Sequence, residues 1–193
     1  MKPTIIAIVG ASGSGKTYLS KLLQNELNVF LIVSYTTRPA REGEIEGIDH
    51  YYISNTHRFS YSQMLSYTRF AEYEYFALED QVPPQKHCAY VVDERGLKYL
   101  KETKSHKFNI ISIRVESTTD ALIQRGIAPD RIKRDDDRTP LPLDYYDYVI
   151  ENNGTLEEFE HKIRETYIKI QQWQHLKRKQ KFTRPSRWIS RTE

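Results

Sequence analysis

The chain has 193 residues, 38% of them hydrophobic, which is enough for one α/β domain with a buried core. Its net charge of +3 suits an anionic small ligand but does not by itself indicate a nucleic-acid partner. The single cysteine, Cys88, excludes an internal disulfide. With no signal-peptide pattern and no membrane-length apolar stretch, we expect a cytoplasmic protein that contacts no membrane.

The N-terminal segment predicts a strand, a glycine-rich turn and a helix. Residues 4–9 form an apolar, β-branched run, typical of a strand that is buried on both faces. Residues 18–27 place leucines on one stripe, as an amphipathic helix does. Between them lies a G-x-x-x-x-G-K-[ST] phosphate loop at Gly10, Ala11, Ser12, Gly13, Ser14, Gly15, Lys16 and Thr17. The strand before it and the helix after it are the context that this motif requires.

The residue types of the loop explain what it can bind. Glycines let successive backbone N–H groups point inward, and the helix N-terminus adds positive charge, so the loop suits a triphosphate. Lys16 is expected to reach the β- and γ-phosphates and to be catalytic. The Thr17 hydroxyl is expected to bind the Mg²⁺ that accompanies the triphosphate.

Further along the chain, helices and strands alternate. We predict buried strands at 29–33, 88–93, 108–115 and 148–150, and helices at 95–104, 118–126 and 156–179. Between 34 and 87 we predict a short strand at 50–54, a small helix at 55–67 and a weak strand at 70–76. Thr155 is a candidate N-cap for the last helix.

This alternation predicts an α/β fold with a mostly parallel sheet and helices on both faces. Ligands of such sheets bind at the carboxyl ends of the strands, where the phosphate loop, Ser34 and Asp93 all fall. We expect these groups to converge on one site. The basic residues after 177 are more simply a solvated helix end than a nucleic-acid surface.

Two motifs at a characteristic separation make the chain resemble the guanylate kinase family. After the phosphate loop comes Ser34-Tyr-Thr-Thr-Arg38-Pro-x-Arg41-x-Gly-Glu44, which is similar to the family's GMP-binding signature. The resemblance covers about residues 4–165 and implies a three-layer P-loop NTPase fold. It implies a core at 1–33 and 88–180, an acceptor-binding region at 34–87 and a lid at about 125–140, followed by a basic tail at 181–193.

The acceptor region contains the groups that a nucleoside monophosphate requires. Arg38 and Arg41 can both hold one phosphate. A carboxylate can accept from two guanine N–H donors, and Glu72 is similar to the family's base-reading acid. The resemblance also places Ser34, Glu44, Tyr51 and Asp93 at the GMP site; Asp93 is equally suited to cap a helix.

Later positively charged residues resemble the lid of the family. Arg125 and Arg134 are expected to close over the transferring phosphoryl group and stabilise its charge. The other interpretation of this segment is a salt-bridged turn among the acids at 130–137. Asn152 resembles the position that contacts adenine.

Four features depart from the family pattern. His50 replaces a tyrosine, Val91 an acid and Ala121 a lid arginine, and the stretch 73–87 is short and lacks a Tyr-Gly-Ser/Thr element. We therefore expect ATP-dependent conversion of GMP to GDP. The alternatives are a kinase of this fold that acts on another small phosphorylated acceptor, and a non-catalytic nucleotide-binding or interaction module.

Overall fold

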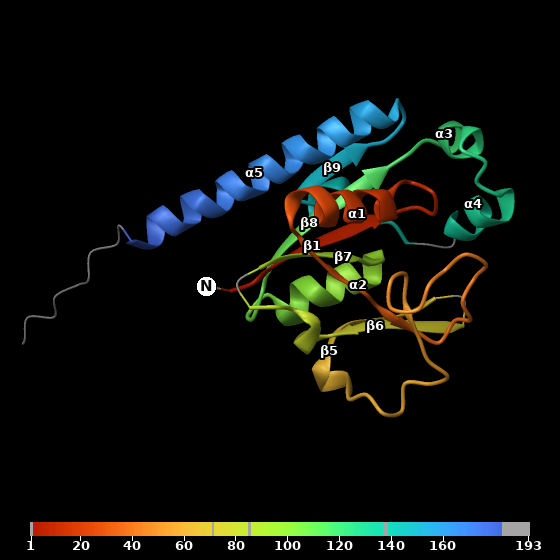
Figure 1. Ribbon diagram of the computed structural model, residues 1–193, viewed down its shortest axis with the longest axis horizontal. Helices are drawn as coiled ribbons and strands as arrows, with labels where there is room; N and C mark the ends of the chain where they lie inside the picture. The colour runs from red at the N-terminus through yellow and green to blue at the C-terminus, as the bar shows by residue number, and fades with distance from the viewer. Residues whose placement is uncertain (1, 71, 85, 137–138, 183–193) are drawn as a thin grey trace, which may run out of the picture.

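The structure is a computed structural model that describes residues 2–70, 72–84, 86–136 and 139–182, without the side chains of 134, 136 and 177–182. Its main sheet has five parallel strands in the order β2-β7-β1-β8-β9 (Figure 1). They are β1 (Thr4–Gly10), β2 (Phe30–Ile32), β7 (His87–Val91), β8 (Asn109–Glu116) and β9 (Tyr148–Glu151). Every residue of the central strand β1 is buried, which confirms the predicted strand.

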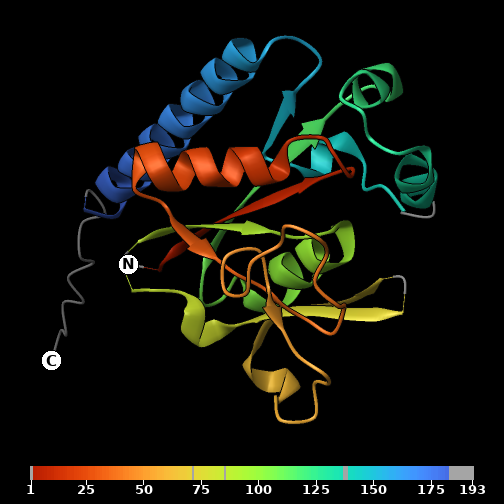
Figure 2. The same cartoon turned by 45° about the vertical axis from the view of Figure 1, so that its right-hand side comes forward.

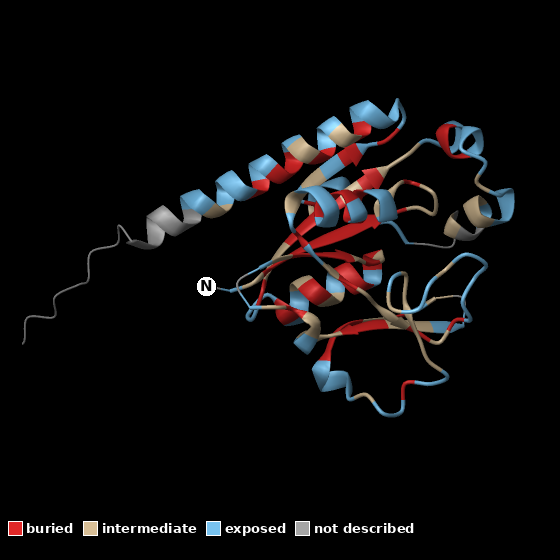
Figure 3. Cartoon of the chain, viewed as in Figure 1, coloured by how far each residue is buried: buried red, intermediate tan, exposed pale blue. Residues whose placement is uncertain are grey.

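Helices cover both faces of this sheet, as predicted. On one face α1 (Lys16–Leu27) and α5 (Leu156–Phe182) lie side by side (Figures 1 and 2). Their apolar side chains pack on the even-numbered residues of β1, Ile6 and Ile8. On the other face α2 (Glu94–Tyr99), continued by the π-helical turn η3 (Leu100–Lys104), packs on the odd-numbered residues of β1. Figure 3 shows the buried residues in the strands and on the inner sides of these helices.

A second sheet lies within residues 34–87, the region predicted to bind the acceptor. Its strand order is β4-β3-β6-β5, from β3 (Tyr35–Thr36), β4 (Tyr51–Tyr52), β5 (Met64–Phe70) and β6 (Tyr73–Leu78). Two short 3-10 helices flank β5 and β6, η1 (Tyr61–Gln63) and η2 (Glu79–Gln81). Leu65 and Ala77 of this sheet share a hydrophobic cluster with α2 and the main sheet, so the two sheets are joined by packing.

The predicted helix at 55–67 is wrong, because β5 begins at Met64 within it. β5 forms a hairpin with β6, with a register shift between Met64 and Ser66 that buries Met64 and Leu65 consecutively. Ser66 and Thr68 are also buried, where their hydroxyls bond to Tyr90 and Asp93. Because polar residues occupy these buried positions, the sequence of β5 lacks the alternation of apolar and polar residues by which strands are recognised.

The last part of the chain carries the predicted lid and the long helix. After β8 come α3 (Thr119–Gln124) and α4 (Pro129–Asp136), and η4 (Leu143–Tyr145) leads into β9. α3 and α4 stand at the carboxyl end of the main sheet (Figures 1 and 2). Thr155 caps α5 as predicted: its Oγ accepts from Glu158 N–H at 3.2 Å, and Glu158 accepts from Thr155 N–H. Of the predicted basic tail, residues 183–193 lie outside the described residues.

Candidate active site

The phosphate loop joins β1 to α1 in the conformation that its glycines permit. Gly13 and Gly15 have φ of 76° and 106°, a region that side chains rarely adopt. A Cβ on Gly15 would lie 2.7 Å from the Asn152 amide nitrogen, so the loop is closely packed there. Lys16 Nζ donates to the Ala11 carbonyl at 2.7 Å, across the loop. Thr17 lies exposed in the first turn of α1.

One cavity of about 200 Å³ connects this loop with the second sheet. The phosphate loop contributes Ser12 and Lys16 to its wall. The acceptor-binding region and the end of β7 contribute Ser34, Arg41, His50, Thr68, Phe70, Tyr75, Tyr90, Val91, Val92 and Asp93. Helix α4, in the predicted lid, contributes Asp135. The convergence expected of the phosphate loop, Ser34 and Asp93 is therefore observed.

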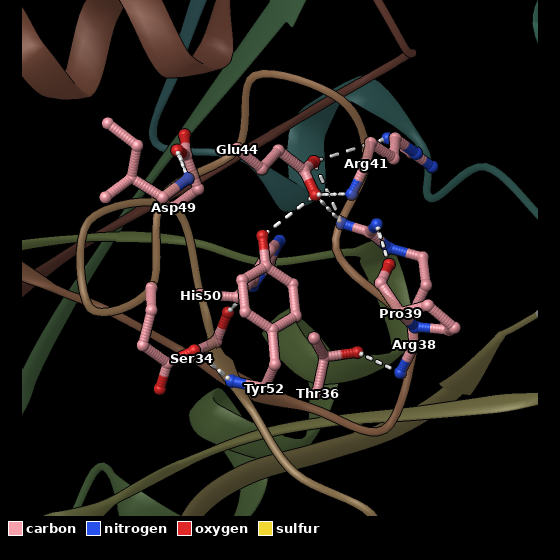
Figure 4. Close-up of polar contacts among 11 residues, drawn as sticks. Ser34, Thr36, Arg38, Pro39, Arg41, Glu44, Asp49, His50 and Tyr52 are labelled. Carbon is pink, nitrogen blue, oxygen red and sulfur yellow. Dashed lines mark hydrogen bonds and ion pairs between the residues drawn. The ribbon is translucent and has the colours of Figure 1, made fainter.

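Beside the cavity, Glu44 organises two arginines of the loop between β3 and β4, residues 37–50, called the acceptor loop after its predicted role (Figure 4). Its carboxylate accepts from the Arg38 guanidinium at 2.9 Å, the Arg41 backbone N–H at 2.8 Å and the Tyr52 hydroxyl at 2.8 Å. Burial would raise the pKa of Glu44, but these hydrogen bonds lower it to about 2. Glu44 is therefore an anion that holds Arg38 in place.

The two acceptor arginines differ in exposure. Arg38 is buried, and its Nε has no hydrogen-bond partner among the described residues. The side chain of Arg41 is 48% exposed. Partial burial and the neighbouring cations Arg38 and Arg131 lower the pKa of Arg41. Glu44 compensates only part of the positive charge around Arg41, so the surroundings of this side chain favour an anionic ligand.

His50 and Asp93 each have hydrogen-bond partners in the cavity wall. His50 Nδ1 lies 2.8 Å from Ser34 Oγ, and burial together with Arg38 lowers the His50 pKa, which favours the neutral imidazole. Asp93 caps α2, since its Oδ1 accepts from Gly96 N–H at 2.7 Å. Its Oδ2 accepts from the Thr68 hydroxyl at 2.7 Å. Asp93 thus combines the capping role with a position in the cavity wall.

The structure does not bring Tyr51 or Glu72 to this cavity. Neighbouring side chains of a strand point to opposite faces. Tyr51 therefore stacks on Tyr35, with ring centroids 4.9 Å apart, while His50 and Tyr52 face the acceptor loop. Glu72 lies exposed in the β5–β6 turn with φ of 68°. Neither residue lines the cavity among the described residues, and their role at the GMP site stays a prediction.

Asn152 and Arg125 fasten the lid segment to the phosphate loop. Asn152 Nδ2 donates to the Ser14 carbonyl at 2.8 Å, so both its side-chain groups contact protein. Arg125 donates to the Asn152 carbonyl, to its Oδ1 at 3.1 Å and to Ser117 Oγ at 3.0 Å. Arg125 is therefore linked to the phosphate loop through Asn152. The side chain of Arg134 lies outside the described residues.

Arg131 does not line the cavity, but it is a cation of the predicted lid whose charge acts on Arg41. It lies on α4, and its Nε is buried without a hydrogen-bond partner among the described residues. Its charge reaches Arg41, as the lowered Arg41 pKa indicates. In the sequence, the only indication of its position is that it lies four residues before Asp135, because residues four apart share a helix face. Ala121, at the expected lid-arginine position, is buried instead in α3.

Three further observations concern the described residues. A larger hollow of about 750 Å³ lies beside the C-terminal half of α5, and its described lining of His87, Gln171, Gln172, Gln174, His175 and Leu176 includes no phosphate-loop residue. The described residues contain no cluster of three or more His, Cys, Asp or Glu suited to a metal. None of the described helices has the length and hydropathy needed to cross a membrane.

Comparisons with known proteins agree with this geometry. The family model for guanylate kinase matches residues 1–172. A guanylate kinase of Ehrlichia canis is 29% identical over 177 residues, covering 83% of each chain. A guanylate kinase of Helicobacter hepaticus is 42% identical over 57 residues; this alignment covers 29% of the present chain and 28% of that relative.

A solved structure has the same fold. The crystal structure of guanylate kinase from Anaplasma phagocytophilum matches with a TM-score of 0.60 and 23% identity, covering 86% of this chain and 83% of that one. The guanylate kinase model matches most of the chain, and the phosphate loop and the cavity that connects it with the second sheet agree with that match. This chain therefore belongs to the guanylate kinase family.

Proposed function

We propose that this protein transfers the γ-phosphoryl group of ATP to GMP, giving ADP and GDP. The observation that carries this proposal is that Lys16 of the phosphate loop and Arg41 of the acceptor loop line the same cavity. A donor at the loop and an acceptor phosphate at the arginines would face each other there. Family membership supports the same reaction.

The reaction requires positioning and positive charge rather than a general base. An oxygen of the GMP phosphate attacks the γ-phosphorus while the bond to the β–γ bridging oxygen breaks and ADP leaves. Lys16 is suited to the β- and γ-phosphates, and Arg38 and Arg41 to the acceptor phosphate. Arg131 lies on α4 and its charge acts on Arg41, so it can add positive charge as the phosphoryl group moves.

The residues present fit a Mg²⁺ ion bound with the nucleotide. Mg²⁺ keeps several waters and uses few protein oxygens besides phosphates, so a single hydroxyl is sufficient. Thr17 is exposed at the start of α1, and among the described residues its hydroxyl makes no hydrogen bond. Thr17 would hold the ion, which neutralises phosphate charge.

One observation favours an acceptor other than GMP. Glu72 lies outside the cavity, and both oxygens of Asp93 already accept hydrogen bonds. Among the described residues, the β7 side of the cavity wall thus offers only Asp93 as a carboxylate, and each of its oxygens already accepts one hydrogen bond from protein. A kinase of this fold that acts on another small phosphorylated acceptor is the alternative. A non-catalytic module is disfavoured, because Lys16 and Thr17 are both present.

The deciding experiment is a coupled assay of ADP release with ATP, Mg²⁺ and a panel of GMP, dGMP, AMP, UMP and CMP. Turnover with GMP well above the other monophosphates supports the proposal. Turnover with a different monophosphate selects the alternative acceptor. If no acceptor gives ADP release while calorimetry shows ATP binding, the chain is a binding module. A cytoplasmic location stays a prediction that microscopy of the tagged protein tests.

A further inference from the structure

The lid helix α4 places an acid on the phosphate loop. Asp135 Oδ2 accepts from the backbone N–H of Ser12 at 2.5 Å, and Oδ1 lies 3.4 Å from Ser12 Oγ. The two residues are far apart in sequence, so the contact joins two ends of the site. It directs both carboxylate oxygens toward one residue of the loop.

A second contact shows that the lid segment rests on the loop. A Cβ added to Gly13 would lie 2.4 Å from Cγ1 of Ile127, so the Ile127 side chain packs directly against this glycine. With the Arg125–Asn152 hydrogen bonds, the segment from Arg125 to Asp135 touches the loop or its support at three points. The position of Asp135 is therefore part of a docked lid rather than one side-chain contact.

The chemistry of the contact is that of a phosphate. Backbone N–H groups of a phosphate loop bind anionic oxygens, helped by the helix that follows. A carboxylate offers two such oxygens and one negative charge. A nucleotide phosphate that used the Ser12 N–H would meet a like charge at the same donor. The two anions cannot share it, so one must leave.

We propose that Asp135 is a built-in competitor of the nucleotide's terminal phosphates, which holds the lid on the phosphate loop until ATP displaces it. This inference rests on the proposed function, because it requires that the loop bind a triphosphate. Displacement frees α4 to move, and Arg131 lies one turn away on the same helix. Binding of the donor would thus be coupled to the position of a cation beside the acceptor arginines.

The test compares Asp135→Ala with Asp130→Ala in the full-length protein. Asp130 lies exposed in the first turn of α4, so its change removes the same charge from the same helix without touching the loop. Calorimetry measures binding of ATP with Mg²⁺, ATP with EDTA, and inorganic triphosphate. Thermal unfolding checks that each variant is folded. Hydrogen exchange of the α4 amides without nucleotide reports on lid docking.

We expect Asp135→Ala to bind ATP and triphosphate at least about tenfold more tightly, a change of about 1.4 kcal/mol, because the phosphates no longer have to displace a charged hydrogen-bond partner of the loop. Its α4 amides should exchange faster than those of the wild type. Asp130→Ala should match the wild type in both measurements, within about twofold.

Three results would overturn the inference. Equal affinities for wild type and Asp135→Ala would show that the carboxylate does not compete, with the proposed function intact. If Asp135→Ala bound ATP more weakly than the wild type in the presence of Mg²⁺ but not in EDTA, Asp135 would be a ligand of the metal. If the wild type bound neither ATP nor triphosphate, the proposed function and this inference would fail together.

Discussion

Replacing Glu44 by glutamine tests how the acceptor loop is held together. The change keeps the shape of the side chain but removes the charge that faces Arg38, which is buried. The drop in the Glu44 pKa from 4.5 to about 2 corresponds to about 3 kcal/mol. The side chain of Glu44 is 20% exposed, and solvent screening reduces this to about 2 kcal/mol.

The pH dependence gives the sign of the effect. The folded-state pKa of Glu44 lies below the unfolded value, so its contribution to stability is present above pH 4.5 and is lost as the pH falls toward about 2. Urea unfolding at pH 7 should therefore show Glu44→Gln to be less stable than the wild type by about 2 kcal/mol. At pH 3 the difference should be about half of that or less.

Glu42→Gln is the matched control, because Glu42 is an exposed acid of the same loop with no ion pair among the described residues. It should leave the free energy of unfolding within about 0.5 kcal/mol of the wild type. The KM for GMP should rise in Glu44→Gln only, since Arg38 loses its fixed position. A Glu44→Gln protein as stable as the Glu42→Gln protein at pH 7 would refute this reasoning.

Three further predictions concern the reaction. Lys16→Met should lower kcat more than about 10²-fold with an unchanged unfolding midpoint, because the phosphates lose the positive charge of Lys16. A rate near that of the wild type would exclude Lys16 from catalysis. Arg131→Ala should lower kcat about 10²-fold with little change in calorimetric ATP affinity, whereas the exposed Lys133→Ala should not; equal rates would remove Arg131 from the site. Glu72→Gln should leave the ratio of GMP to AMP turnover within about twofold, since Glu72 is exposed outside the cavity; a relaxed ratio would restore it as a base-reading residue.

Local patterns in the sequence determined the donor half of this protein. The apolar run of β1, the glycines of the loop and the stripe of α1 are each adjacent in the chain, and each pattern has a local physical cause. The parallel sheet followed from the alternation of buried strands and helices. The Thr155 cap was predictable because the capping residue and its partner are three positions apart.

Only the tertiary structure decided which acceptor-region residues meet. β5 was hidden by Ser66 and Thr68, whose partners Tyr90 and Asp93 are distant in sequence. The hairpin register then placed Glu72 in a turn.

The same holds for the two contacts that matter most for the proposals. Asp135 meets Ser12 across 123 positions, and Arg131 affects Arg41 from another element. Charged side chains on a surface helix show no period that marks their partner, because solvation satisfies them almost equally well in many positions. Their roles became visible only when packing brought α4, the phosphate loop and the acceptor loop to one cavity.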